Sequence, residues 1–163
     1  MSNHITALDL ESDDTQWPTV WFAIAQHPWR SLVLVPADER ISVLPMARAL
    51  TKAARLYEER PVYLIEAENA APSDVRAITA NVRDCALQGQ RIIVAVRSPL
   101  VSHPATPIAR ACDAAILLVP LAQTKVATAK QVIAIVGHSA FLGAFTVAVP
   151  PGDAQEQAPR DGD

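Results

Sequence analysis

The segment "SLVLVPADERISVLPMARAL", residues 31–50, decides the fold prediction. Residues 31–35 are a short apolar run, which is typical of a strand buried on both faces. Ser42 and Pro45 suit the start of a helix, because serine is a favoured N-cap and proline is tolerated in the first turn. Polar and apolar side chains then alternate at helical spacing, which predicts an amphipathic helix. A buried strand that leads directly into such a helix predicts an α/β fold.

Further apolar runs of strand length follow along the chain, at residues 62–66, 91–96, 115–119 and 143–149. Segments with helical periodicity or helix-capping residues separate these runs. We therefore predict an open α/β fold with a mostly parallel sheet of five or more strands, helices on both faces and right-handed crossovers. Ligands bind beyond the carboxyl ends of the strands in such sheets, so the candidate site lies in the loops 36–42, 66–73, 97–104 and 120–124.

The chain is predicted to be a single domain over residues 15–149, with a flexible acidic lead-in at 1–14 and a disordered tail at 150–163. Half of its 163 residues are hydrophobic and the formal net charge is −3, which argues against a nucleic-acid partner. No apolar run approaches the roughly 20 residues that span a bilayer, and the polar N-terminus is unlike a secretory signal. We expect a cytoplasmic protein without direct membrane insertion.

The aromatic and sulfur-containing residues are interpreted structurally. All three tryptophans lie between residues 17 and 29, where we expect core packing, with an exposed docking patch as the alternative. Cys85 and Cys112 lack CxxC spacing and are expected to act as small buried hydrophobes. The four histidines show no metal-ligand spacing, so no metal site is predicted.

Four later segments carry a resemblance to a known family: "PVYLIEAEN" at 61–69, "RIIVAVRSPLV" at 91–101, "ARACDAAILLVPLAQTKV" at 109–126 and "FLGAFTVAV" at 141–149. In order and spacing they resemble the P-loop ATPases of the chromosome-partitioning and septum-site (ParA/MinD-like) class. The closest resemblance is to the cytoplasmic tyrosine autokinase domains of bacterial polysaccharide co-polymerases. It covers about residues 15–149 and implies a P-loop NTPase-like fold, with Glu66 and Glu68 at the family's two acidic positions.

The chain departs from this family at the phosphate loop. In "PADERISVLP", residues 36–45, the glycines and the lysine that bind phosphate are absent, and Asp38 adds negative charge. Arg40 and Ser42 offer one positive charge and one hydroxyl, which do not rebuild the phosphate cradle. Arg97 replaces the family's acidic residue and can be neither a metal ligand nor a base. We therefore expect no catalytic residue and no Mg-ATP bound in the usual way.

The candidate anion-binding or partner-binding edge of the sheet comprises eight residues: Asp38, Arg40, Ser42, Glu66, Glu68, Arg97, Ser98 and Thr124. We expect Glu66 to form an ion pair with Arg97 across neighbouring strand ends, and Glu68 to be solvated. Thr124 is expected to cap the helix that follows it. Asp113 is interpreted as an acceptor that stabilises a turn between a helix and a strand.

The leading functional hypothesis is a pseudoenzyme that regulates or scaffolds polysaccharide biosynthesis and export machinery. The resemblance implies a protein partner, either a catalytic paralogue or a membrane polysaccharide co-polymerase, which would recruit the chain to the inner membrane. Self-association is also open. The alternative is a binder or enzyme for a phosphate-type or sulfate-type anion, or for a nucleotide in a non-standard pose. A self-associating positioning protein of the partitioning class is a third hypothesis.

Overall fold

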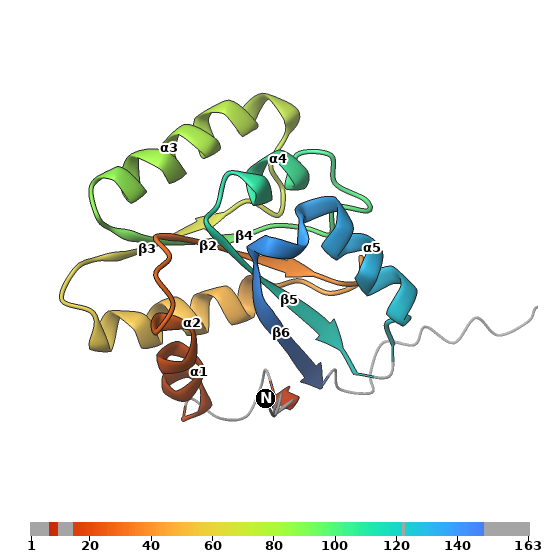
Figure 1. Cartoon of the computed structure of the whole chain (residues 1–163), viewed down its shortest axis with the longest axis horizontal. Coiled ribbons are helices and arrows are strands. Elements are labelled where there is room, and N and C mark those ends of the chain that lie inside the picture. The colour runs from red at the N-terminus through yellow and green to blue at the C-terminus, as the bar shows by residue number, and fades with distance from the viewer. Residues whose placement is uncertain (1–6, 10–14, 122, 149–163) are drawn as a thin grey trace, which may run out of the picture.

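The sheet is open and entirely parallel. The structure, a computed structural model, describes residues 7–9, 15–121 and 123–148. Within these ranges six strands pair in the order β1-β6-β5-β2-β4-β3 (Figure 1). The strands are β1 (Ala7–Asp9), β2 (Ser31–Pro36), β3 (Val62–Glu66), β4 (Arg91–Ala95), β5 (Ala114–Pro120) and β6 (Phe141–Ala148). The predicted parallel sheet of five or more strands is confirmed.

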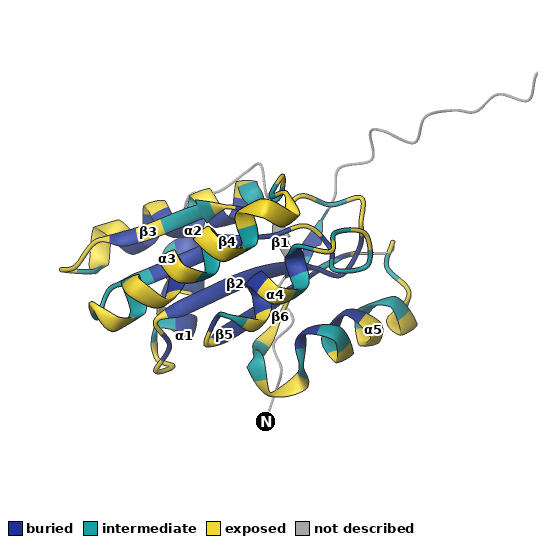
Figure 2. Cartoon of the chain, turned by 90° about the horizontal axis from the view of Figure 1, so that it is seen from above, coloured by how far each residue is buried: buried dark blue, intermediate teal, exposed yellow. Residues whose placement is uncertain are grey.

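Helices cover both faces of this sheet. They are α1 (Gln16–Ala25), α2 (Leu44–Tyr57), α3 (Val75–Leu87), α4 (Ala105–Arg110) and α5 (Val126–Val136). One core cluster joins the sheet to α1 and α2, and a second joins it to α3, α4 and α5 (Figures 1 and 2). In the described part of the chain, no helix combines the length and the apolarity needed to cross a membrane.

The central strand β2 explains why residues 31–35 read as a continuous apolar run. Leu32 and Leu34 belong to the cluster beneath α1 and α2, whereas Val33 and Val35 belong to the cluster on the opposite face. Every residue of β2 is buried, as the dark central strand in Figure 2 shows. A strand that is covered on both faces and paired on both edges has no solvent-facing position for a polar side chain.

The predicted lead-in contains one strand that the sequence analysis did not identify. Residues 7–9 form β1 and pair in parallel with β6, with Ala7 in register with Thr146. The rest of the lead-in, residues 1–6 and 10–14, and the predicted disordered tail lie outside the described residues. Gly89 follows the end of α3 (Val75–Leu87), and its φ of 72° is one that glycine adopts readily.

The three tryptophans pack into the core, which confirms the prediction. Trp17, Trp21 and Trp29 are 5%, 1% and 3% exposed. The Trp21 and Trp29 rings meet edge to face at 5.8 Å between centroids. The guanidinium of Arg91 lies 4.7 Å from the Trp29 centroid and donates a hydrogen bond to the carbonyl of Ala25. This cation-π and hydrogen-bonded contact fixes the end of α1 against β4.

The two free cysteines are predicted to differ sharply in reactivity. Burial, with a smaller contribution from Asp113, raises the pKa of the Cys112 thiol to about 12, so about one molecule in ten thousand carries its thiolate at pH 8. Cys85 is only partly buried, and burial raises its pKa too. Iodoacetamide should label Cys85 slowly and Cys112 only after unfolding, as followed by intact mass. Equal labelling rates in the folded chain would contradict the packing around Cys112.

Candidate functional site

The loops at the carboxyl edge of the sheet enclose two open depressions. The first measures about 320 Å³ and is lined by Glu39, Arg40, Ile41, Ser42, Glu68, Asn69 and Arg97. The second measures about 290 Å³ and is lined by Asp38, Glu39, Arg40, Leu100, Gln123, Lys125 and Thr128. Five of the eight predicted residues, Asp38, Arg40, Ser42, Glu68 and Arg97, therefore line the expected edge. Glu66, Ser98 and Thr124 line neither depression.

Asp38 and Arg40 satisfy each other within the loop that follows β2. The Asp38 carboxylate accepts hydrogen bonds from Arg40 Nε at 2.9 Å, from Arg40 Nη2 at 2.8 Å and from the Arg40 backbone N–H at 3.0 Å. The Arg40 side-chain hydrogen bond is the main cause that holds the pKa of the buried Asp38 carboxyl below its usual range, against the opposing effect of burial. Arg40 also donates to the carbonyl of Gln123 at 3.3 Å. The one cation of this loop is thus already committed to a carboxylate.

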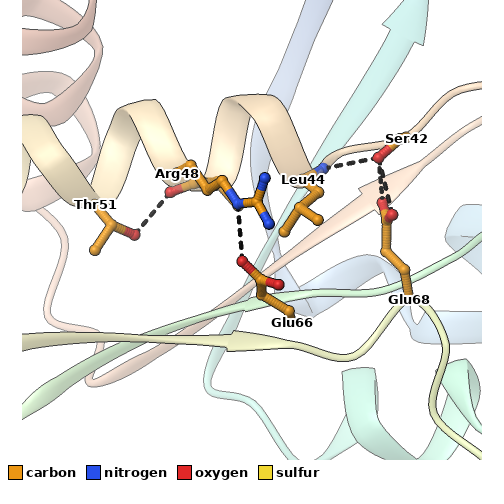
Figure 3. Close-up of polar contacts among 7 residues, drawn as sticks. Ser42, Leu44, Arg48, Thr51, Glu66 and Glu68 are labelled. Carbon is orange, nitrogen blue, oxygen red and sulfur yellow. Dashed lines mark hydrogen bonds and ion pairs between the residues drawn. The ribbon is translucent and has the colours of Figure 1, made fainter.

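The N-terminus of α2 carries a carboxylate from the neighbouring loop (Figure 3). Glu68 accepts a hydrogen bond from the backbone N–H of Val43 at 2.8 Å and from the hydroxyl of Ser42, which lies 2.8 Å from both carboxylate oxygens. Ser42 in turn accepts the N–H of Leu44 at 3.2 Å. The prediction of a solvated Glu68 was wrong, because the backbone N–H groups at a helix N-terminus attract an anion and Glu68 supplies it.

Glu66 also differs from the prediction, since its partner is Arg48 on α2 rather than Arg97. Arg48 Nε donates to Glu66 Oε1 at 2.8 Å, and this hydrogen bond is the main cause that lowers the pKa of Glu66 (Figure 3). Glu66 is in register with Ala95 of β4, so Arg97 lies two residues further out. Arg48 lies on α2, the helix that connects β2 to β3, and this helix brings Arg48 within hydrogen-bond distance of Glu66.

Arg97 is exposed and makes no hydrogen bond or ion pair to any described residue. Arg97 lines the first depression together with Ser42, Glu68 and Asn69. Arg97 is therefore a positive group available to a ligand or partner at this edge. The first depression nevertheless also contains the carboxylates of Glu39 and Glu68, so its charge is mixed.

The remaining predicted residues have structural positions. Ser98 is buried, and its carbonyl accepts the N–H groups of Val101 and Ser102, which closes a turn. Thr124 does not cap α5, because Lys125 is the N-cap residue and provides no side-chain cap. Thr124 Oγ1 is buried and makes no hydrogen bond of good geometry to a described residue, although the nearby hydroxyl still contributes weakly to the low pKa of Asp38.

Asp113, at the opposite, amino end of the strands, is a hydrogen-bond acceptor as predicted, but its partners belong to the start of β2 rather than to its own turn. Its carboxylate accepts the backbone N–H groups of Arg30 and Ser31 at 2.9 and 3.1 Å, and its own N–H donates to the Ser31 hydroxyl at 2.8 Å. This reciprocal contact fixes the start of β2 against the start of β5.

Sequence reasoning missed Arg48, Asn69, Gln123 and Lys125. Arg48 was recognisable only as part of an exposed polar stripe, yet a crossover helix packs near the strand that it leads into, which brings such a residue to the strand end. Among the described residues, no group of three or more histidine, cysteine, aspartate or glutamate side chains could hold a metal ion. At this edge the described residues offer one hydroxyl that is hydrogen-bonded to a carboxylate, Ser42 with Glu68, and both groups also accept backbone N–H groups at the start of α2.

No protein-family model matches this chain, and a search of curated proteins found no significant match either.

Proposed function

We propose that this chain is a non-catalytic, P-loop-like protein that regulates or scaffolds a partner, and that it does not bind Mg-ATP. The observation that carries the proposal is the Glu68 carboxylate on the N-terminus of α2. In nucleotide-binding α/β folds, the helix N-terminus that follows such a strand is where phosphate binds. Here the chain's own carboxylate makes the hydrogen bonds that a phosphate would otherwise make.

The charges around this helix end support the same proposal. Arg40 is held by Asp38 and cannot neutralise a phosphate without leaving a buried carboxylate unpaired. Glu39 and Glu68 add negative charge to the depression beside it. A triphosphate would have to displace Glu68 and approach the carboxylates of Asp38 and Glu39, which makes triphosphate binding unfavourable.

A protein-binding role is supported by apolar side chains on the outer surface of α1 and α2. The Phe22 and Tyr57 rings are each 50% exposed and contact each other in a tilted arrangement, with 4.7 Å between centroids. Leu56 is 73% exposed and borders a small groove that includes Trp17 and Pro18. Contiguous exposed apolar surface often marks a protein interface. We infer that the partner is a protein, with a catalytic paralogue or a membrane polysaccharide co-polymerase as the partner that the family resemblance suggests.

The second candidate function is binding of a phosphate-type or sulfate-type anion, because Arg97 has no partner in the described residues and lines an open depression. Such an anion would bind beside Glu68 rather than in its place. Arg97→Ala would then abolish stabilisation by the anion, and this substitution separates the two candidates.

Thermal melting with and without Mg-ATP, Mg-ADP and sodium sulfate tests the proposed function. A ligand at about 100 times its Kd would raise the melting midpoint by about 5–11 °C for a chain of this size. We expect no rise with either nucleotide, and with sulfate only the general stabilisation that the Arg97→Ala variant shows equally. A nucleotide-dependent rise would overturn the proposal. A sulfate effect that Arg97→Ala removes would favour the second candidate.

A further inference from the structure

Strand β3 forms one edge of the sheet, and every second residue of β3 directs its backbone groups outward. The backbone N–H of Ala67 donates to the carbonyl of Ala95 on β4 at 2.8 Å. The carbonyl of Val62, in contrast, accepts a hydrogen bond from Arg55 Nε at 3.2 Å. Because backbone groups alternate in direction along a strand, Tyr63 and Ile65 pair with β4. The backbone N–H and C=O groups of Val62, Leu64 and Glu66 therefore point away from β4, toward the open edge of the sheet.

The outward backbone groups at Leu64 and Glu66 have no hydrogen-bond partner among the described residues. Beside them an open groove of about 470 Å³ separates β3 from α3, and it is lined by Tyr63, Leu64, Ile65, Asn81, Asp84, Cys85, Gln88, Gln90 and Ile92. Tyr63 is 39% exposed there although it lies in a strand. An accessible edge with unpaired N–H and C=O groups beside a partly apolar groove is a template for another strand.

We propose that β3 of one copy pairs antiparallel with β3 of a second copy, about a two-fold axis at Leu64. In this register Leu64 faces its own symmetry mate, and Val62 faces Glu66 of the second copy. The outward groups of these residues then exchange hydrogen bonds in pairs. Tyr63 faces Ile65 of the second copy in the closer, non-hydrogen-bonded pair, where an aromatic and a β-branched side chain pack favourably. Both of these side chains line the groove beside α3, which the second copy therefore fills.

The charges along the edge favour this antiparallel self-pairing. This register places Glu66 beside Val62 of the second copy, where the exposed Arg55 side chain donates to the Val62 carbonyl. A parallel pairing in equivalent register would instead place Glu66 on Glu66. Opposite charges across an edge stabilise one register and like charges exclude the other.

The symmetry also limits the assembly to two copies at this edge. A two-fold contact uses the same surface on both partners, so each β3 edge is fully occupied once the pair has formed. A contact made by one five-residue strand and one groove is small, and contacts of this size are weak and concentration-dependent. The inference goes beyond the proposed function and is independent of nucleotide binding, because a chain that binds no ATP can be monomeric or dimeric.

Sedimentation velocity over a concentration range reaching hundreds of micromolar, combined with residue-resolved amide hydrogen exchange, tests the pairing. The mass should rise from 17.5 kDa toward twice that value as the concentration increases. The Leu64 and Glu66 amides should exchange rapidly in dilute protein and become protected when it is concentrated. The Tyr63 and Ile65 amides, bonded to β4, should be protected throughout.

Two substitutions and one control complete the test. Leu64→Pro removes one outward N–H without touching the hydrogen bonds to β4. Tyr63→Lys places a charge in the groove at an already exposed position, so that a folded variant exists even if the proline is not tolerated. Both should remain at 17.5 kDa at concentrations where wild type and the control Phe22→Lys, on exposed α1 surface, are dimeric. The pairing is refuted by a wild-type chain that stays monomeric, by a dimer whose Leu64 and Glu66 amides remain unprotected, or by a dimer that survives both substitutions.

Discussion

Replacing Trp21 with alanine is expected to reduce the free energy of unfolding by about 3–5 kcal/mol, the largest single loss that we predict for this chain. Trp21 is 1% exposed, so its removal leaves a cavity between α1 and the sheet. The substitution also removes the edge-to-face contact with Trp29 and one of the two rings beside the Arg91 guanidinium, whose carbon lies 5.5 Å from the Trp21 centroid. Urea unfolding followed by far-UV circular dichroism measures the loss.

Phe22→Ala is the matched control for this prediction, because Phe22 is the next residue of the same helix. Its ring is 50% exposed and contacts Tyr57 at the surface. Its loss should cost about 1 kcal/mol or less. The two variants lose aromatic side chains from adjacent positions and change helix propensity in the same direction, so burial is the main difference between them. Equal losses for the two variants would contradict the packing described for Trp21.

The second large effect is expected for Glu68→Ala, which should reduce the free energy of unfolding by about 1–3 kcal/mol. The substitution leaves the N–H of Val43 and the hydroxyl of Ser42 without their acceptor at the N-terminus of α2. It also removes a negative charge that the helix dipole stabilises. Glu66→Ala is the matched control, two residues earlier in the chain. Its pairing with Arg48 is exposed, so no measurable change is expected.

Sulfate distinguishes the proposed role of Glu68 from simple capping. If the carboxylate occupies an anion-binding position, sulfate should fill the vacated position in Glu68→Ala and restore part of the lost stability. Sulfate also stabilises proteins in general, so the quantity to compare is the extra stabilisation of Glu68→Ala over wild type and over Glu66→Ala. Sodium chloride at matched ionic strength completes the comparison. An identical sulfate response in all three proteins would show that the helix N-terminus cannot hold a free anion.

The fold was largely predictable because its signals are local. Residues 32–35 are all apolar, which is the pattern of a strand covered on both faces. Strand β1 was not predictable, because its three residues carry no periodicity and their conformation depends on pairing with β6. Strand β1 forms only because β6, near the C-terminal end of the chain, provides the sheet edge with which it pairs.

The candidate site was predictable as a location but only partly as a set of contacts. Parallel strands place the loops that follow β2, β3 and β4 at one edge, which brought Arg40, Glu68 and Arg97 together as expected. The partners of the carboxylates depended on distances that strand order alone does not give. Arg48 reaches Glu66 from α2, and Glu68 turns back to the same helix. Both contacts depend on where α2 begins relative to the end of β3.

The order of strands has a consequence for how the chain folds. The central strand β2 lies early in the sequence, whereas its neighbours β4 and β5 lie much later. Strand β1 can pair only when β6 is present, because residue 7 pairs with residue 146. The pairings that build the sheet therefore close long loops, and the entropy of loop closure must be lost before the contacts form. Until β4 and β5 are available, the apolar β2 has both edges open. This interval, rather than the finished structure, is when the chain is most exposed to aggregation.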